Sequence, residues 1–106
     1  MDSDGYPKGI YLIPIDNRPR RFEYDAGKNT ANEAKHGVTF EEARRIWDDP
    51  DYLRIPAKKK GEKRFMALGM VDGRCLAAVA TERGDAIRII SARRASEKEA
   101  KRYGDA

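Results

Sequence analysis

The chain has 106 residues, of which 40% are hydrophobic and 38% are charged. This length suits one hydrophobic core and argues against a second independent domain, and the apolar share is enough for a compact fold. The sequence lacks an apolar stretch long enough for a membrane span and lacks the regions of a signal peptide, so we expect a cytoplasmic protein.

Positive charge is concentrated in two segments. Lys and Arg outnumber Asp and Glu by 22 to 18, for a net charge of +4. Residues 22–51 carry eight acids and four bases, residues 52–71 one acid and six bases, and residues 83–103 seven bases and three acids. A fold that joins the two basic segments would present a cationic surface to phosphates. A solvated surface of mixed charge is the alternative.

Residues 1–21 differ from the rest and are treated as an N-terminal extension of unknown role, with the domain over residues 22–106. Prolines and a glycine interrupt this segment around one short apolar run. Within it, residues 10–13 predict either an added edge strand, since Pro14 forbids a central one, or a flexible arm.

Two helices are expected next. Asp25 is a suitable N-cap, and Gly37 can take the left-handed conformation that ends a helix. Thr39 and Glu42 form a capping box for a second helix, which Asp49-Pro50 ends. The apolar positions of that second helix, which predict its core-facing side, are Phe40, Ala43, Ile46 and Trp47.

The pattern then changes to strands. Four antiparallel strands are expected over residues 52–55, 64–70, 74–81 and 86–92, with a basic loop after the first. Asp72-Gly73 and Gly84-Asp85 supply turns, and Ser96 with Glu99 predicts a last helix that ends at Gly104. The fold class is therefore α+β, with two N-terminal helices, an antiparallel four-stranded sheet and a C-terminal helix.

Strict alternation along the last strand has a consequence for its arginines. Ile87, Ile89, Ser91 and Arg93 would share one face, and Arg88 would lie on the other. Arginines are therefore expected on both faces of the sheet.

Five ordered blocks of residues 22–103 resemble the BrnT family of type II toxin–antitoxin systems. They are Phe22-Glu23-Tyr24-Asp25, Asn32-x-x-Lys35-His36-Gly37-Val38-x-Phe40-Glu41-Glu42-Ala43 with Asp49-Pro50, Glu62-x-Arg64-Phe65-x-x-x-Gly69, Thr81-Glu82-Arg83-Gly84, and Arg88-Ile89-Ile90-Ser91-Ala92-Arg93-Arg94-Ala95. Five pieces in order over most of the domain make an accidental similarity improbable.

The resemblance implies a RelE-like ribonuclease fold that cuts RNA without a metal ion or other cofactor and inhibits translation. It also implies a BrnA-like antitoxin, encoded beside the toxin, that supplies a ribbon-helix-helix DNA-binding part. The two proteins would form a heterotetramer and repress their own operon, so operator DNA would be bound only through the complex.

Cleavage of RNA without a metal needs a base, phosphate-binding donors and an acid. Guanidinium groups are suitable donors because they are always charged and bind phosphate through two nitrogens. The arginines assigned to this task are Arg64, Arg83, Arg88, Arg93 and Arg94. Salt bridges to antitoxin acids, or simple solubility, are the alternative role of each.

The acid and base candidates are less distinct. His36 is the only histidine, but a histidine beside Gly37 is also typical of a stabilised helix C-terminus. Glu62 is either a base or the ion-pair partner of Arg64, and Tyr103 either stacks on a base or packs on the sheet. Phosphate contacts are assigned to Lys35, Lys59 and Lys60, although a lysine run is also typical of a solvated loop.

These observations favour an endoribonuclease toxin. The alternatives are a non-enzymatic nucleic-acid-binding protein and an adaptor that only binds its antitoxin. The toxin hypothesis predicts that the arginines of the last turn and last strand converge with the basic loop around one RNA phosphate.

Overall fold

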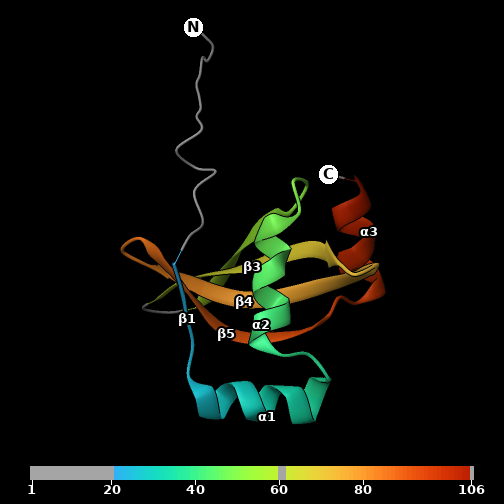
Figure 1. Ribbon diagram of the computed structural model, residues 1–106. Coiled ribbons are helices and arrows are strands. Elements are labelled where there is room, and N and C mark those ends of the chain that lie inside the picture. The colour runs from blue at the N-terminus through green and yellow to red at the C-terminus, as the bar shows by residue number, and fades with distance from the viewer. Residues whose placement is uncertain (1–20, 60–61, 106) are drawn as a thin grey trace, which may run out of the picture.

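The computed structural model describes residues 21–59 and 62–105, which form a five-stranded sheet with helices packed around it (Figure 1). The strand order is β1-β5-β4-β3-β2, with β1 parallel to β5 and the other pairs antiparallel. The elements are β1 (Arg21–Glu23), α1 (Ala26–His36), α2 (Phe40–Ala43), the 3₁₀ helix η2 (Arg44–Asp48), β2 (Leu53–Lys59), β3 (Glu62–Val71), β4 (Arg74–Arg83), β5 (Ala86–Arg94) and α3 (Glu97–Asp105).

The α+β class is confirmed, but the arrangement differs from the prediction in three ways. Strand β1 was not expected, so the sheet has five strands and is mixed rather than four-stranded and antiparallel. The second helix keeps α geometry for only four residues before it tightens into η2. The first predicted strand continues through Lys59, because an edge strand tolerates the proline and lysines that suggested a loop.

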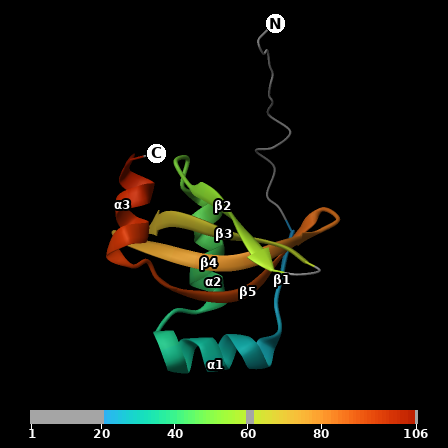
Figure 2. The same cartoon turned by 180° about the vertical axis from the view of Figure 1, so that it is seen from behind.

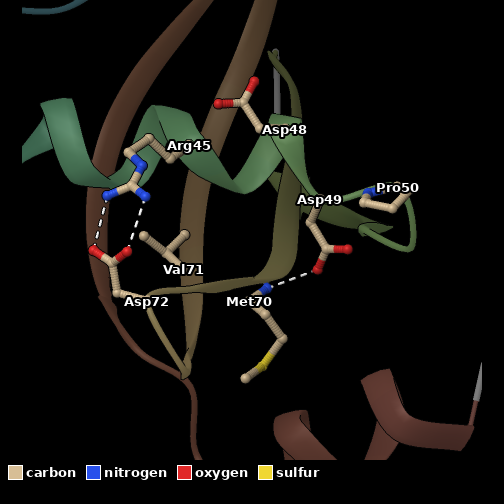
Figure 3. Close-up of a pocket in the computed structure, with 7 residues that line it drawn as sticks. All are labelled: Arg45, Asp48, Asp49, Pro50, Met70, Val71 and Asp72. Carbon is tan, nitrogen blue, oxygen red and sulfur yellow. Dashed lines mark hydrogen bonds and ion pairs between the residues drawn. The ribbon is translucent and has the colours of Figure 1, made fainter.

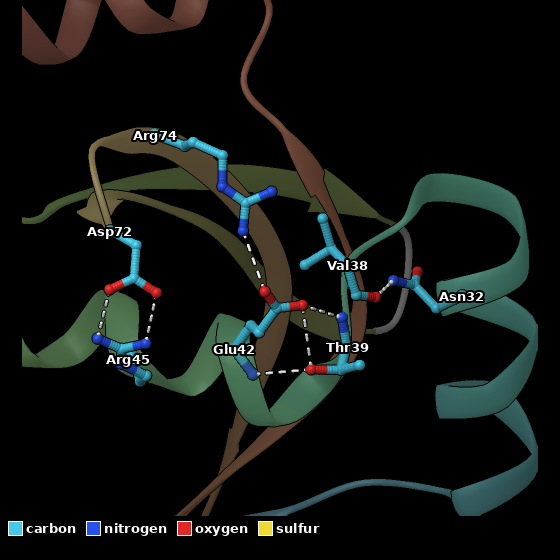
Figure 4. A network of polar contacts seen from close by, with 7 residues as sticks. All are labelled: Asn32, Val38, Thr39, Glu42, Arg45, Asp72 and Arg74. Carbon is cyan, nitrogen blue, oxygen red and sulfur yellow. Dashed lines mark hydrogen bonds and ion pairs between the residues drawn. The ribbon is translucent and has the colours of Figure 1, made fainter.

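The local signals at the starts of the α-helices and at the end of α1 are confirmed. The carboxylate of Asp25 accepts a hydrogen bond from the amide of Lys28, and Gly37 ends α1 with φ = 72°. Thr39 and Glu42 make both bonds of a capping box, drawn in Figure 4. The amide of Glu99 donates to the Ser96 hydroxyl at 3.1 Å, which begins α3. These caps satisfy amide groups that a helix end leaves without a partner.

The core lies between the sheet and α2–η2. Figure 1 shows α2 crossing in front of the sheet, and Figure 2, seen from behind, shows the opposite face. The buried residues of this core are Val38, Phe40, Ala43, Ile46, Phe65, Ala67, Val71, Leu76, Ala78, Ala80, Ile87, Ile89 and Ala92. We call the sheet face opposite α2–η2 the open face.

Gly69 lets η2 approach the sheet closely. A Cβ at Gly69 would lie 2.9 Å from Cγ2 of Ile46 and 3.1 Å from its carbonyl oxygen. Those separations are shorter than normal van der Waals contact, so any larger residue would displace η2 from β3.

Asn32 connects α1 to the exposed edge of β5. Its Nδ2 donates to the carbonyl oxygens of Ala92 and Val38, each at 2.8 Å, and its Oδ1 accepts from the amide of Ala92 at 3.1 Å. Strand β1 pairs only with residues 86–88 of β5, so beyond that point α1 lies along the edge (Figures 1 and 2). The buried side-chain amide of Asn32 therefore satisfies both backbone groups of Ala92, as a neighbouring strand would.

A β-bulge in β5 overturns the expectation that Arg88 and Arg93 lie on opposite faces, although Arg94 on the core side keeps arginines on both faces. Ala80 pairs with Ile89 but Val79 pairs with Ser91, so Ile90 is an extra residue. The alternation therefore shifts by one position after Ile89. Arg93 pairs with Ala77, next to the buried Ala92–Ala78 pair of the core face, and so lies on the same open face as Arg88.

Aromatic packing fixes the face that β1 presents. The ring of Phe22 lies 5.2 Å from that of Trp47 in an edge-to-face arrangement, and the guanidinium of Arg44 lies 5.4 Å from the Phe22 ring. Trp47 also packs edge-to-face on Phe65, which confirms its expected place against the core. Since Phe22 points to the core side, its neighbour Glu23 points to the open face.

Candidate functional site

A polar row crosses the open face near β1. The strand register places Arg64 of β3 opposite Thr81 of β4, Thr81 opposite Arg88 of β5, and Arg88 beside Glu23 of β1. Neighbouring strands lie about 4.8 Å apart, so the row spans roughly 14 Å. The hydroxyl of Thr81 donates to the carbonyl oxygen of Lys63 at 2.8 Å, which leaves a short side chain between two long arginines.

Glu23 is shared between two arginines. One carboxylate oxygen of Glu23 lies 3.6 Å from Nη1 of Arg83 and 3.5 Å from Nη1 of Arg88. The side chains of Arg83, Arg88 and Glu23 are 57%, 38% and 34% exposed. We call these three residues the Glu23 cluster. Because two guanidinium groups share one oxygen at long distances, both retain N–H donors for a further anion.

Arg21 completes the charge pattern around the cluster. Its guanidinium lies 3.5 Å from the second oxygen of Glu23 and 3.3 Å from the carboxylate of Asp85. Both contacts are at the exposed end of the β4–β5 hairpin, where ion pairs contribute little to stability. The cluster is therefore a region of excess positive charge that an anion can reach.

Arg93 has a different environment at the other end of the open face. Its Nη1 and Nη2 bind the two carboxylate oxygens of Glu99 in α3 at 2.7 and 2.9 Å. These bonds from Arg93, together with those from Ser96, lower the pKa of Glu99 to about 2 even though partial burial opposes the shift. Four residues along β4 separate this row from the Thr81 row, which is about 13 Å. Arg93 therefore anchors α3 and is not part of the Glu23 cluster.

Tyr103 also holds α3. Its hydroxyl donates to the carboxylate of Asp49 at 2.5 Å, and this bond raises the pKa of Tyr103 to about 12. Burial alone would raise the pKa of Asp49, but hydrogen bonds from Tyr103 and from the amides of Met70 and Asp51 lower it overall. Asp49 thus ties the loop after η2 to both β3 and α3.

A pocket of about 260 Å³ lies beside Asp49 and is drawn in Figure 3. Arg45 and Asp72 form a two-bond ion pair at one side, with N–O distances of 2.8 and 2.9 Å. The partly exposed side chain of Met70 lies between that pair and Asp49 (Figure 3). The pocket is lined by three acids, Asp48, Asp49 and Asp72, against the single cation Arg45, which Asp72 already binds. This pocket is therefore less suited to an RNA phosphate than the Glu23 cluster.

The remaining predicted site residues lie apart from the cluster or outside the described part. Lys35 and His36 are exposed at the end of α1, beside the sheet edge. Arg94 is exposed and pairs with Leu76, on the core side of the sheet. Lys59 ends β2 and Glu62 begins β3, but their side chains are outside the description, and Lys60 and residues 10–13 are outside it entirely.

Two residues that were not assigned a role prove important. The sequence places Glu23 in a motif but predicts no role for it, because the three residues of β1 are too few to show the alternation of a strand. Asn32 was noted in the same way, although its partner is 60 positions away. In both cases the signal in the sequence was a polar residue inside a family block, without any local pattern to explain it.

The chain was compared with models of known protein families. A family model described as "Ribonuclease toxin, BrnT, of type II toxin-antitoxin system" matches residues 24–99. No curated protein matches the chain. Among the residues that the structure describes, none of the helices is long and apolar enough to cross a membrane. No group of three or more His, Cys, Asp or Glu side chains in the same residues is placed to hold a metal ion.

Proposed function

Because the chain belongs to the BrnT family of ribonuclease toxins, we propose that it cleaves RNA at the Glu23 cluster and the adjoining Arg64–Thr81 pair, without a metal ion. The observation that carries the proposal is the shared carboxylate of Glu23, which leaves Arg83 and Arg88 with donors free for a phosphate. Cleavage of RNA at this site would inhibit translation in the cell.

The chemistry follows from where charge develops. Attack on a phosphate puts further negative charge on its oxygens, and guanidinium groups fixed beside those oxygens stabilise the transition state. Arg83 and Arg88 come from opposite strands of one hairpin, so the sheet fixes their spacing before RNA binds. Arg64, across Thr81, would contact the next phosphate of the same strand.

The proposal includes a partner. A BrnA-like antitoxin with a ribbon-helix-helix part would neutralise the toxin in a heterotetramer and bring the complex to its operator DNA. Family membership supports an antitoxin partner, and the net charge of +4 suits a partner with acidic groups. Coexpression with the neighbouring reading frame, followed by measurement of complex mass and operator binding, tests this part.

The cleavage proposal is tested with purified full-length chain, single-stranded RNA and an excess of chelator. We expect cleavage by the wild type and a loss of about 1,000-fold in the Arg83→Ala, Arg88→Ala double variant. Arg102→Ala is the matched control, because Arg102 is exposed on α3 and forms no ion pair within the part of the chain described.

RNA binding that weakens with salt, without any strand cleavage by the wild type, would contradict the enzyme and support the non-enzymatic alternative. Cleavage that disappears in chelator would contradict the absence of a metal. Full activity in the double variant would show that cleavage occurs elsewhere on the protein.

A further inference from the structure

We propose that Glu23 is the general base of this ribonuclease, taking the proton from the RNA 2′-hydroxyl that attacks the phosphate held by Arg83 and Arg88. The inference rests on the proposed ribonuclease activity and adds the group that starts the reaction.

The position of Glu23 matches what a base needs. A base must lie beside the nucleophile, and the nucleophilic 2′-hydroxyl is on the sugar carbon next to the one that carries the reacting phosphate. An anion bound by Arg83 and Arg88 must lie next to the carboxylate that they already contact, at 3.6 and 3.5 Å. The ribose of the same nucleotide would therefore approach Glu23, which is partly exposed and can be reached.

Strand β1 makes the position rigid. Glu23 is paired in register with Arg88, so the backbone that carries the base is fixed to the backbone that carries a phosphate ligand. Packing of Phe22 on Trp47 prevents β1 from rotating its side chains to the other face. A catalytic group on a strand held in this way is more precisely placed than one on a loop.

The other described candidates are committed elsewhere. His36 lies at the end of α1, along the sheet edge. Glu99 binds Arg93 through two hydrogen bonds, and the Tyr103 hydroxyl donates to Asp49. Glu82 lies on the core side of the sheet and pairs with Arg54 at 3.3 Å. Each of these groups would need a rearrangement to reach a phosphate at the Glu23 cluster.

The step balances as a transesterification. The Glu23 carboxylate takes the 2′-hydroxyl proton as the 2′-oxygen forms a bond to phosphorus and the bond from phosphorus to the 5′-oxygen breaks. The departing 5′-oxygen takes a proton from water, and Glu23 returns its proton to the hydroxide that remains. The products are a 2′,3′-cyclic phosphate and a 5′-hydroxyl end.

The test is Glu23→Gln in the full chain, which keeps the size of the side chain and removes the basic oxygen. We expect cleavage to fall by about 100-fold or more. Affinity for a 2′-deoxy oligonucleotide, which cannot be cleaved by this route, should stay equal or increase, because a negative charge is removed. Glu33→Gln, on the exposed surface of α1, is the control and should cleave as the wild type does.

A second substrate separates a base from an acid. Replacing the 5′-bridging oxygen by sulfur gives a leaving group that needs no proton, so it rescues the loss of an acid but not of a base. We expect Glu23→Gln to remain about 100-fold below the wild type on this substrate. Rescue by sulfur would overturn the inference and assign Glu23 the role of acid.

The outcomes are distinguishable from failure of the proposed function. A wild type that leaves RNA intact overturns both claims, whereas an active Glu23→Gln with an inactive Arg88→Ala overturns only the role of Glu23. If Glu23→Gln melts below the assay temperature, Glu23→Asp replaces it, since it keeps the charge and withdraws the carboxylate by one methylene. A folded Glu23→Asp with undiminished cleavage would also contradict the inference.

Discussion

The two ends of the open face use arginine in opposite ways. At the α3 end, Arg93 binds both oxygens of the Glu99 carboxylate, through two hydrogen bonds of 2.7 and 2.9 Å. At the β1 end, Arg83 and Arg88 share one oxygen of Glu23 at 3.6 and 3.5 Å. The first arrangement satisfies the guanidinium, and the second leaves it with donors to offer. Both ends use arginine, so the carboxylate contacts of each arginine decide whether it stabilises the fold or can bind a ligand.

The contrast matters because both ends were expected to bind RNA. The sequence alone does not show whether an arginine in a basic protein stabilises the fold or binds RNA, and an exposed ion pair is weak evidence for either role. The number of acceptors available to each guanidinium is a better guide here. The open face therefore divides into a structural end and a functional end on one continuous sheet.

The largest effects are expected for Arg88→Ala and Arg93→Ala, of which the first should impair RNA cleavage and the second should impair stability. Arg88→Ala should lower the RNA cleavage rate by about 100-fold or more and change the melting temperature little. Arg93→Ala should lower the free energy of unfolding by about 1.5 kcal/mol, because Glu99 loses its charged partner, and should leave cleavage within a few-fold of the wild type. Cleavage assays and chemical denaturation of both variants measure this, and the reverse pattern would refute the division of the open face.

The Arg93–Glu99 pair should also give the stability a distinct pH dependence. The pKa of Glu99 is lowered from 4.5 to about 2 in the folded chain, chiefly by its hydrogen bonds with Arg93. A lowered carboxyl pKa stabilises the fold fully above about pH 5, and this contribution declines as the pH falls toward 2. The wild type should therefore exceed Glu99→Gln by about 1 kcal/mol at neutral pH, after allowance for the partial exposure of Arg93.

Thermal melting of both proteins between pH 7 and pH 3 provides the measurement. The difference in melting temperature should stay constant from pH 7 to about pH 5 and shrink as the pH falls from there to 3. A difference that is constant over the whole range would show that the pair does not hold α3 in solution.

An effect no larger than that of Glu99→Gln is expected for Tyr103→Phe, which removes one hydrogen bond to Asp49 and keeps the ring. The cost should be about 1 kcal/mol of unfolding free energy at neutral pH. Because the pKa of Tyr103 is raised to about 12, this stabilisation is complete below pH 10 and is lost as the pH rises through 12. Spectrophotometric titration of tyrosinate should show one fewer late-titrating group in the variant than in the wild type, and unchanged RNA cleavage would place Tyr103 with the structural end.

Local sequence signals predicted most of the helices and strands, but the long-range pairing of strands could not be predicted from the sequence. The caps at Asp25, Gly37 and Thr39 depend on atoms within a few residues, so their spacing was sufficient. Pairing of β1 with β5 joins segments 65 residues apart, as in the Glu23–Arg88 contact. A three-residue strand has no periodicity from which such a pairing can be inferred.

The candidate site was predicted in part for the same reason. Arg64, Arg83 and Arg88 were chosen for their chemistry and lie together on the open face. Arg93 was chosen on the same grounds, but its partner Glu99 had been assigned only to a helix cap. The sequence shows which residues have guanidinium groups. Which carboxylate each guanidinium contacts depends on strand register and on the bulge.

The bulge at Ile90 also limits which changes in chain length β5 can accept. Loss of that single residue would restore strict alternation, and every side chain after it would change sides. The guanidinium of Arg93 would then be forced among apolar groups, and Ala92 would leave the amide of Asn32 without its matched partners. The extra residue Ile90 thus keeps Arg93 on the face that α3 contacts and Ala92 in register with Asn32. Deletion of Ile90 should therefore be far more damaging than any substitution at the same position.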